Sequence, residues 1–241
     1  RGAAVLTSRK DWYDKPGALP DDVIAAIRKR FGMGWWSISL RFYGYEGVNE
    51  AAAAVVQAAF AKKSQQAFKV TRWKQGMPLE PTPLQGFPVT FPLANAAWHG
   101  GRGGHIGYSP VLPSNGRAAM DQFRRTYNRY QEYGMDYHGS FSMSERSITN
   151  VNQVLFNKDD AEMMKRVNGF FRALVSDATE RRYGEYRTHI EYMDLVAGTY
   201  DFNNHALRRA NEAVKDALDP NGILAPGKSG IWPKRYRNLR T

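Results

Sequence analysis

The sequence predicts an α+β fold, in which an antiparallel or mixed sheet is flanked by helices and followed by a separate helical segment. Two observations predict it. Segments with helical periodicity alternate with short aromatic and β-branched runs as far as about residue 183. Beyond that point the chain holds one amphipathic helix and a tail rich in Pro and Gly. We therefore predict two parts, residues 1–183 and residues 184–241.

The N-terminal part is predicted to hold two helices and two strands. Residues 19–32 start with a Pro-Asp-Asp signal, end at Gly32 and carry apolar residues at helical spacing. Residues 49–64 are rich in Ala, with acid first and base last, which suits the dipole of a helix. Residues 35–44 and 66–74 are aromatic and β-branched, so each predicts a strand.

Residues 76–116 predict a long irregular connection. Pro, Gly and Asn are frequent there, and four aromatic residues fall from Phe87 to Tyr108 inclusive. Long loops within a compact protein are usually either functional or disordered. The aromatic content favours an ordered, functional loop.

The next elements are predicted from their periodicity. A helix is expected from about Asn115 to Tyr133, and residues 134–144 and 147–157 alternate as two paired strands. Residues 158–180 predict a strongly amphipathic helix, and a last helix is expected to end at Asp219. The residues predicted to face inward from the helix over 158–180 are Met164, Val167, Phe171, Leu174 and Val175.

Composition excludes several classes of protein. The 241 residues include no Cys, which excludes disulfides, iron–sulfur clusters and thiol catalysis, and the five His form no metal-binding motif, so we expect no metal. No run of 18 apolar residues predicts a membrane span, and no signal peptide is visible, so we expect a cytoplasmic protein. The first residue is Arg rather than Met, which indicates a piece of a longer or processed chain.

The net charge of +11 favours an anionic partner, whether nucleic acid, phosphate or an acidic small molecule. A solvated basic surface is the simpler alternative. Arg and Tyr do interleave over residues 123–133, as in an RNA-stacking surface. However, Phe123, Tyr127 and Tyr130 share one side of the predicted helix and are expected to face the core.

Three short motifs carry residues suited to chemistry. His105 ends a glycine run that allows close approach to a flat ring, and it could act as a nucleophile or attachment point. Tyr186 and Arg187 offer a phenol donor and a fixed positive charge that suit a developing oxyanion. Lys228 lies in a Gly-flanked turn that could bind phosphate. Their structural alternatives are a buried imidazole, a surface salt-bridge segment and an exposed turn.

Taken together, "GGHIGYSPV", "YGEYRTHIEYMD" and "DPNGILAPGKSGIWP" resemble the vanillyl-alcohol oxidase family of flavoproteins, among which the eugenol and 4-alkylphenol oxidases are most similar. The C-terminal string is the most specific of the three. The resemblance implies that residues 1–183 are most of a substrate-binding cap domain and that residues 184–241 return to an FAD-binding domain. Members of the family are more than twice this length, and the upstream half of the FAD-binding domain is not in this sequence.

The resemblance also implies roles for single residues. His105 matches the histidine joined through its ring to the 8α-methyl of FAD (8α-N-histidyl), and Tyr186 with Arg187 matches the pair that holds the substrate as phenolate. Glu185, Arg187 and Lys228 match positions near the cofactor. The positions that match the wall of the substrate cavity are Gly107, Ser109, Tyr137 and Ser140.

The implied activity is the oxidation of para-substituted phenols, of the vanillyl alcohol, eugenol or 4-alkylphenol type. A hydride leaves the benzylic carbon for flavin N5 and a quinone methide forms, after which O2 reoxidises the flavin to give H2O2. Relatives that pass electrons to a cytochrome are the alternative, and a basic nucleic-acid-binding module is a distant one. The implied partners are the phenol, O2, the missing FAD-domain half and a second copy in a homodimer, with no nucleic acid and no membrane.

Overall fold

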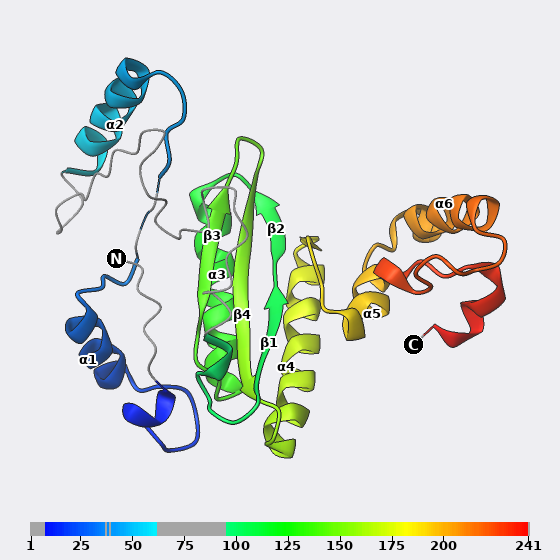
Figure 1. Ribbon diagram of the computed structural model, residues 1–241, viewed down its shortest axis with the longest axis horizontal. Coiled ribbons are helices and arrows are strands. Elements are labelled where there is room, and N and C mark those ends of the chain that lie inside the picture. Colours follow the sequence, from blue (N-terminus) through cyan, green and yellow to red (C-terminus); the bar gives the residue numbers. More distant parts are fainter. Residues whose placement is uncertain (1–7, 37, 39, 62–94, 241) are drawn as a thin grey trace, which may run out of the picture.

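The computed structural model describes residues 8–36, 38, 40–61 and 95–240. Figure 1 shows three parts in chain order: an N-terminal part with α1 and α2, a central sheet with α3 and α4 beside it, and a C-terminal part with α5 and α6. The strand predicted over 66–74 and the start of the predicted connection lie outside the described residues.

The two N-terminal helices confirm the prediction from periodicity. Helix α1 is Asp21–Phe31, and it ends at Gly32, whose φ of 61° is the left-handed conformation that glycine adopts at low cost. Helix α2 is Glu46–Ala61. Neither helix buries a residue, so little of their stability comes from packing within the described chain.

A buried ion pair holds the start of the described chain against the sheet. Arg9, in the short 3-10 helix η1 (Arg9–Asp11), donates from Nε to Oδ2 of Asp136 at 2.9 Å. The same carboxylate accepts from Trp98 Nε1 and from the backbone N of Leu19, both at 2.8 Å. The other guanidinium nitrogens donate to carbonyl oxygens between residues 13 and 17. Both charged groups of this buried pair therefore form several hydrogen bonds besides the one that joins them.

The sheet is built around one long strand. Its strands are β1 (Gly103–Tyr108), β2 (Pro110–Pro113), β3 (Gly139–Met143), β4 (Ser147–Asn157) and β5 (Gly184–Glu185). Every pairing among them is antiparallel. Strands β1 and β2 follow one another along one edge of β4, β3 pairs along the other edge, and β5 adds to β2.

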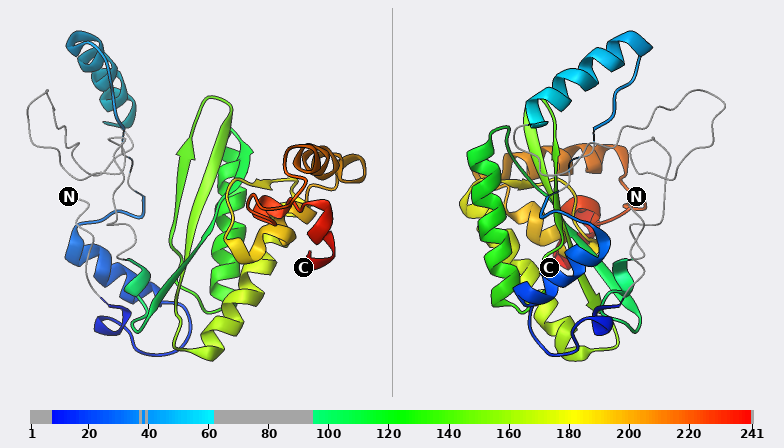
Figure 2. Two further views of the ribbon diagram at one scale, coloured as in Figure 1. Left: turned by 45° about the vertical axis from the view of Figure 1, so that its right-hand side comes forward. Right: turned by 90° about the vertical axis from the view of Figure 1, so that its left-hand side faces the viewer.

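Two helices cover one face of the sheet, as two views in Figure 2 show. Helix α3 is Gly116–Glu132, capped by the Asn115 side chain, and α4 is Ala161–Glu180, capped by Asp160. Alternate residues of β1 and β4 face these helices and form the core with them. Fully buried core residues include Tyr108, Tyr130, Val154, Phe170, Phe171 and Leu174.

The C-terminal part wraps around a short helix. After η4 (Ile190–Tyr192), α5 is Met193–Gly198 and α6 is Phe202–Leu218, followed by the 3-10 turns η5 (Lys228–Gly230) and η6 (Lys234–Leu239). Trp232 Nε1 donates to Asp194 Oδ1 of α5 at 2.8 Å. A Cβ at Gly230 would lie 2.3 Å from the Cβ of Ala197, so glycine is required for the tail to pack on α5.

Two predictions about strands are corrected. No described residue over 35–44 is in a strand, and Trp35 and Tyr43 are 60% and 73% exposed. Aromatic composition favours a strand, but a strand needs a paired neighbour, and this segment has none among the described residues. Conversely, the predicted irregular connection contains β1 and β2. Its glycines fit tight packing, since a Cβ at Gly104 would lie 2.3 Å from the Phe156 ring.

The predicted helix faces are confirmed with one exception. Val167, Phe171, Leu174 and Val175 are buried, whereas Met164 is 40% exposed. Phe170 is buried against the sheet instead of Met164, because positions 167, 170, 171 and 174 form the side of α4 that faces the sheet. On α3, Tyr130 is fully buried as expected.

Candidate functional site

The sheet face away from α3 and α4 carries several of the predicted site residues. Residues paired directly across antiparallel strands point to the same face. His105 pairs with Leu155, Gly107 with Gln153 and Ser140 with Val151, and all of these positions alternate with the buried core residues. We call the face defined by His105, Gly107, Gln153 and Ser140 the site face.

His105 is half-buried on this face. Burial is the main cause that lowers its pKa below the ordinary value of 6.5, and electrostatic interactions with Arg187 and His189 lower it further. The imidazole is therefore neutral near pH 7, which leaves one ring nitrogen with a free electron pair. Next to it, a Cβ at Gly107 would meet no atom of the described residues within 4 Å, so these residues leave room beside the histidine for a bulky group.

Glu185 joins the break between β1 and β2 to the Tyr186–Arg187 pair. Its Oε1 accepts a hydrogen bond from the backbone N of Ser109 at 2.6 Å, and the backbone N of Tyr186 donates to the Ser109 carbonyl at 3.0 Å. Burial raises the pKa of Glu185 from 4.5 to about 8, although the Ser109 bond and the Arg187 charge oppose the rise. The carboxyl is therefore largely protonated at pH 7.

Oε2 of Glu185 is buried and has no hydrogen-bond partner in the described part of the chain, and Tyr200 donates from its hydroxyl to the Glu185 carbonyl at 3.1 Å. The orphaned oxygen fits a protonated carboxyl that lacks its acceptor, since an ionised one would need more donors than the site provides.

Tyr186 and Arg187 are adjacent and accessible. Tyr186 is 65% exposed, and the Arg187 guanidinium carbon lies 5.8 Å from the centre of its ring. Arg187 also acts electrostatically on both His105 and Glu185. The structure thus brings the Arg187 guanidinium into electrostatic range of the candidate histidine, with the ring of Tyr186 beside the guanidinium.

Tyr137 lies on the opposite face of the sheet. Its ring contacts those of Phe123, Tyr127 and Tyr130 on α3, with centroids 5.2 to 5.7 Å apart. Burial raises its pKa to about 12, although the side chain of Asn150 opposes the rise. Tyr137 is therefore not brought together with His105 and Gly107 in this structure.

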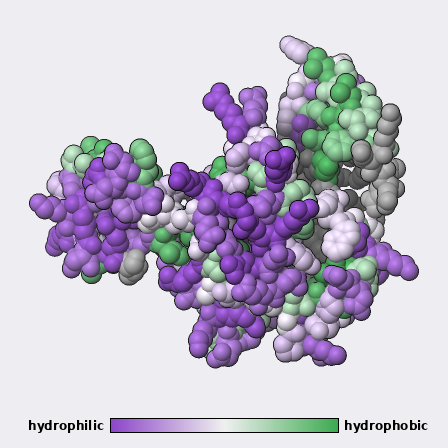
Figure 3. All heavy atoms as spheres, turned by 180° about the vertical axis from the view of Figure 1, so that it is seen from behind, coloured by the Kyte–Doolittle hydropathy of each residue, from purple (hydrophilic) through white to green (hydrophobic). Residues whose placement is uncertain are grey.

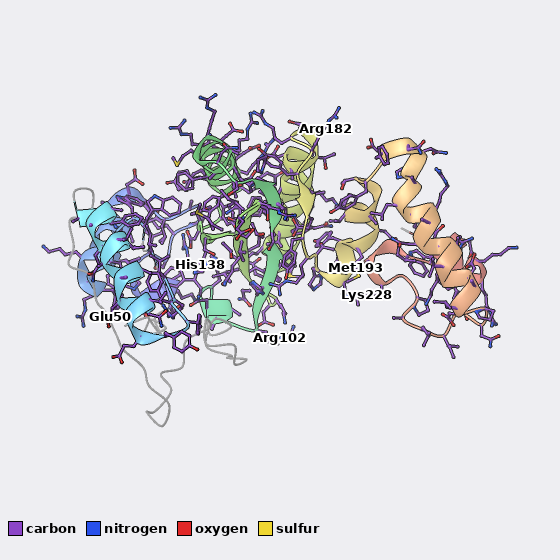
Figure 4. All side chains as sticks on the ribbon, turned by 90° about the horizontal axis from the view of Figure 1, so that it is seen from above. Glu50, Arg102, His138, Arg182, Met193 and Lys228 are labelled. Carbon is purple, nitrogen blue, oxygen red and sulfur yellow. The ribbon has the colours of Figure 1, made fainter. Side chains whose placement is uncertain are left out.

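Lys228 is exposed in η5 and packs with the C-terminal part rather than with the sheet. The next residue, Ser229, donates its backbone N to the sulfur of Met193 on α5. Figure 4 shows Lys228 beside Met193, well separated from His138 on the sheet. A shallow groove of about 430 Å³ lies between α6 and η5, and Lys228 forms part of its wall.

Sequence reasoning missed a set of buried amide side chains that connect β4 to the strands on either side of it. Asn150 and Asn152 of β4 are fully buried, and their Nδ2 atoms donate to the carbonyls of Ser140 and Tyr108 on the two neighbouring strands. Gln122 of α3 donates to Asn150 Oδ1 at 3.3 Å. The signal was present, since Asn occupies alternate positions of β4 among apolar core residues.

The chain is similar to known flavoproteins in sequence and in fold. The profile described as FAD linked oxidases, C-terminal domain, matches residues 151–229. The flavoprotein subunit of 4-cresol dehydrogenase [hydroxylating] from Pseudomonas putida is 31% identical over 234 residues, which are 95% of this chain and 44% of that protein.

Two solved structures are similar over nearly the whole chain. A 4-ethylphenol oxidase from Gulosibacter chungangensis, in complex with isoeugenol, has a TM-score of 0.85 and 32% identity over 98% of this chain and 46% of its own. A substrate-bound p-cresol methylhydroxylase has a TM-score of 0.79 and 26% identity over 95% of this chain and 44% of its own. The chain therefore spans less than half the length of these relatives.

The fold and the matched profile define this chain as the C-terminal domain of an FAD-linked oxidase. More narrowly, it belongs to the family that contains vanillyl-alcohol oxidase and p-cresol methylhydroxylase, as the resemblance of its C-terminal strings predicts. The predicted α+β class, with an antiparallel sheet and helices, is confirmed by the same similarity.

Proposed function

We propose that this chain is the substrate-binding part of a flavoenzyme that oxidises para-substituted phenols. The observation that carries the proposal is the grouping of His105, Arg187 and Glu185 at one end of the site face. The proposal is also supported by the names of the relatives, which refer to two para-alkylphenols: p-cresol (4-cresol) in two of the names and 4-ethylphenol in the third.

The residues present fit an FAD, and His105 is the proposed point of covalent attachment. It is half-buried, its pKa is lowered, and the open space at Gly107 leaves room for a ring system beside it. When bound, the flavin would supply the two-electron oxidation, as the acceptor of a hydride from the benzylic carbon. Lys228 is proposed to meet the cofactor from the C-terminal part once the FAD-binding region is in place.

Tyr186 and Arg187 are the proposed phenol-binding pair. An accessible hydroxyl and a guanidinium beside it stabilise a phenolate, and so lower the free energy of phenol ionisation. Glu185 holds this pair against Ser109. A largely protonated Glu185 leaves the positive charge of Arg187 uncompensated, so that charge remains available to the substrate.

The substrate cavity is proposed to lie over Gly107, Ser109 and Ser140, whereas Tyr137 packs against α3 on the other face of the sheet. Gly107 leaves open space and Ser140 is exposed, whereas Ser109 is buried and offers its backbone. Small groups at positions 107 and 109 leave room for an extended para substituent.

We propose O2 as the electron acceptor, with H2O2 as product, because a histidine at position 105 fits the histidyl-linked oxidases. A cytochrome acceptor is the alternative, and it is supported by the similarity to the 4-cresol dehydrogenase subunit. Oxygen uptake during turnover, compared with reduction of cytochrome c under argon, distinguishes the two.

The proposed partner of this chain is the FAD-binding half that its relatives contain. Leu207, Val214 and Leu218 of α6 are 54 to 77% exposed, and Figure 3 shows apolar residues gathered over α6 and over α2. We assign residues 184–241 to that FAD-binding domain, residues 1–183 to the cap, and the assembled protein to a homodimer. No helix among the described residues has the length and apolarity needed to cross a membrane.

Two variants of the flavin-loaded protein test the proposal. His105→Ala should release the flavin on acid precipitation and slow turnover, whereas the parent should keep its flavin bound to the denatured chain. Arg187→Ala should lower kcat/KM for a para-alkylphenol by about 10²- to 10³-fold, as loss of an oxyanion donor does. Flavin that stays attached in the first variant, or an unchanged kcat/KM in the second, would contradict the assignments.

A further inference from the structure

Gln153 occupies the centre of the site face. Across the sheet it is flanked by Gly107 on β1 and by His138 at the start of the β3 edge, where the Gln153 backbone N donates to the His138 carbonyl at 2.8 Å. Its neighbours two positions along are Val151, paired with Ser140, and Leu155, paired with His105. A side chain in this position lies between the proposed flavin attachment point and the proposed cavity.

The Gln153 side chain carries an unused hydrogen-bonding group. Its Oε1 is buried and has no hydrogen-bond partner among the described residues. A buried carbonyl oxygen without a donor is unfavourable, so such an atom is usually satisfied by a ligand or a bound water. The open space at Gly107, directly beside it on the same face, is where that ligand can enter.

We propose that Gln153 is a specificity-determining residue that favours phenols with a hydroxyl group on the para substituent over para-alkylphenols of the same size. A carboxamide both donates and accepts, and a hydroxyl does the same, so the two groups satisfy each other. An alkyl group of equal length would leave the buried amide unpaired, which is the basis of strong discrimination between isosteric substrates. This inference rests on the proposed function.

The test compares two phenols with equal numbers of heavy atoms, 4-hydroxybenzyl alcohol and 4-ethylphenol. The ratio of their kcat/KM values is measured for the flavin-loaded protein, for Gln153→Met and for Gln153→Leu. Met keeps the length of the side chain without the amide, and Leu provides a second apolar variant if Met folds poorly. The matched control is Gln131→Leu, the same chemical change at an exposed position of α3.

The proposal expects the ratio of alcohol to alkylphenol to fall at least tenfold in a Gln153 variant and to stay unchanged in Gln131→Leu. An unchanged ratio in folded, active Gln153 variants would overturn this inference and leave the proposed function intact. An equal loss on both substrates, together with a shifted flavin absorption spectrum, would place the amide against the cofactor and also overturn it. If the parent oxidises neither phenol, both proposals fail.

Discussion

Glu185 Oε1 and the backbone N of Ser109 are joined by a 2.6 Å hydrogen bond that ties the break between β1 and β2 to the short strand β5. The next residue, Tyr186, donates its backbone N to the carbonyl of the same serine. Two hydrogen bonds to one residue thus fix where the Tyr186–Arg187 pair leaves the sheet. The spacing between the proposed phenol-binding pair and the wall of the cavity depends on this connection.

The raised pKa of Glu185 predicts a pH-dependent stability. The folded state binds the proton more tightly than the unfolded state, because the folded pKa is about 8 and the ordinary value is 4.5. The stabilisation from this group is therefore complete below pH 4.5 and is lost as the pH rises to 8. In Glu185→Gln the melting temperature should fall less between pH 5 and pH 8 than in the parent. Parallel pH profiles would contradict the buried, protonated carboxyl.

Gly104 and Gly107 form a matched pair on one strand. A Cβ at Gly104 would lie 2.3 Å from the Phe156 ring, so Gly104→Ala should destabilise the fold by about 1–3 kcal/mol through overpacking. A Cβ at Gly107 would meet nothing within 4 Å, so Gly107→Ala should leave the unfolding midpoint unchanged. Chemical denaturation measures both, and equal losses in the two variants would contradict the different packing of these positions.

Gly107→Ala should nevertheless change substrate choice, since it adds a methyl group to the proposed cavity. We expect kcat/KM to fall more for a propyl than for a methyl para substituent, and steady-state kinetics on the two phenols measures this. A uniform effect on both would place Gly107 outside the cavity.

The buried amides of β4 predict a large loss of stability at a position far from any charge. Asn150→Leu leaves Gln122, Asn152 and the Ser140 carbonyl short of a partner. Each buried polar group left unpaired lowers the free energy of unfolding by about 1–3 kcal/mol. Urea denaturation measures the loss, with Asn128→Leu on the exposed side of α3 as the control. A loss no larger than in the control would contradict the bracing role of Asn150.

The Arg9–Asp136 ion pair predicts a second large effect. The two side chains are only 10% and 11% exposed. Asp136→Asn removes the negative charge that pairs with the buried Arg9 guanidinium, so it should destabilise the protein by about 3–5 kcal/mol. Asp159→Asn provides the control, because its ion pair with Arg102 is exposed, and its unfolding midpoint should stay close to the parent's. Similar midpoints for the two variants would show that the buried pair carries little stability.

The elements that the sequence predicts well are those with local signals. Helix α1 has a Gly stop, α3 has an Asn cap, and the β3–β4 hairpin shows regular alternation, so each follows from neighbouring residues alone. Strand β1 was missed because glycines occupy half of its positions, and only the pairing with Phe156 and its neighbours on β4 reveals why they are there. The segment 35–44 shows the reverse, a composition typical of strands without a partner.

The candidate site also contains some features that the sequence predicts and others that only the structure shows. Tyr186, Arg187 and His105 were found through residue types and a family resemblance, and the structure adds that the charge of Arg187 acts on His105. The unpaired oxygens of Glu185 and Gln153, and the position of Tyr137 against α3, depend on contacts between residues distant in sequence. No local pattern predicts those contacts.

The central position of β4 has a consequence for the order in which the protein assembles. Its hairpin with β3 closes through a short turn, whereas its pairing with β1 joins residues as distant as Gly103 and Asn157. Local contacts form faster than distant ones, because less chain entropy is lost in closing them. We therefore expect the hairpin to form early and β1 to dock late. His105 would reach its place near the end of folding, so the proposed attachment of flavin to this residue would require a nearly folded chain.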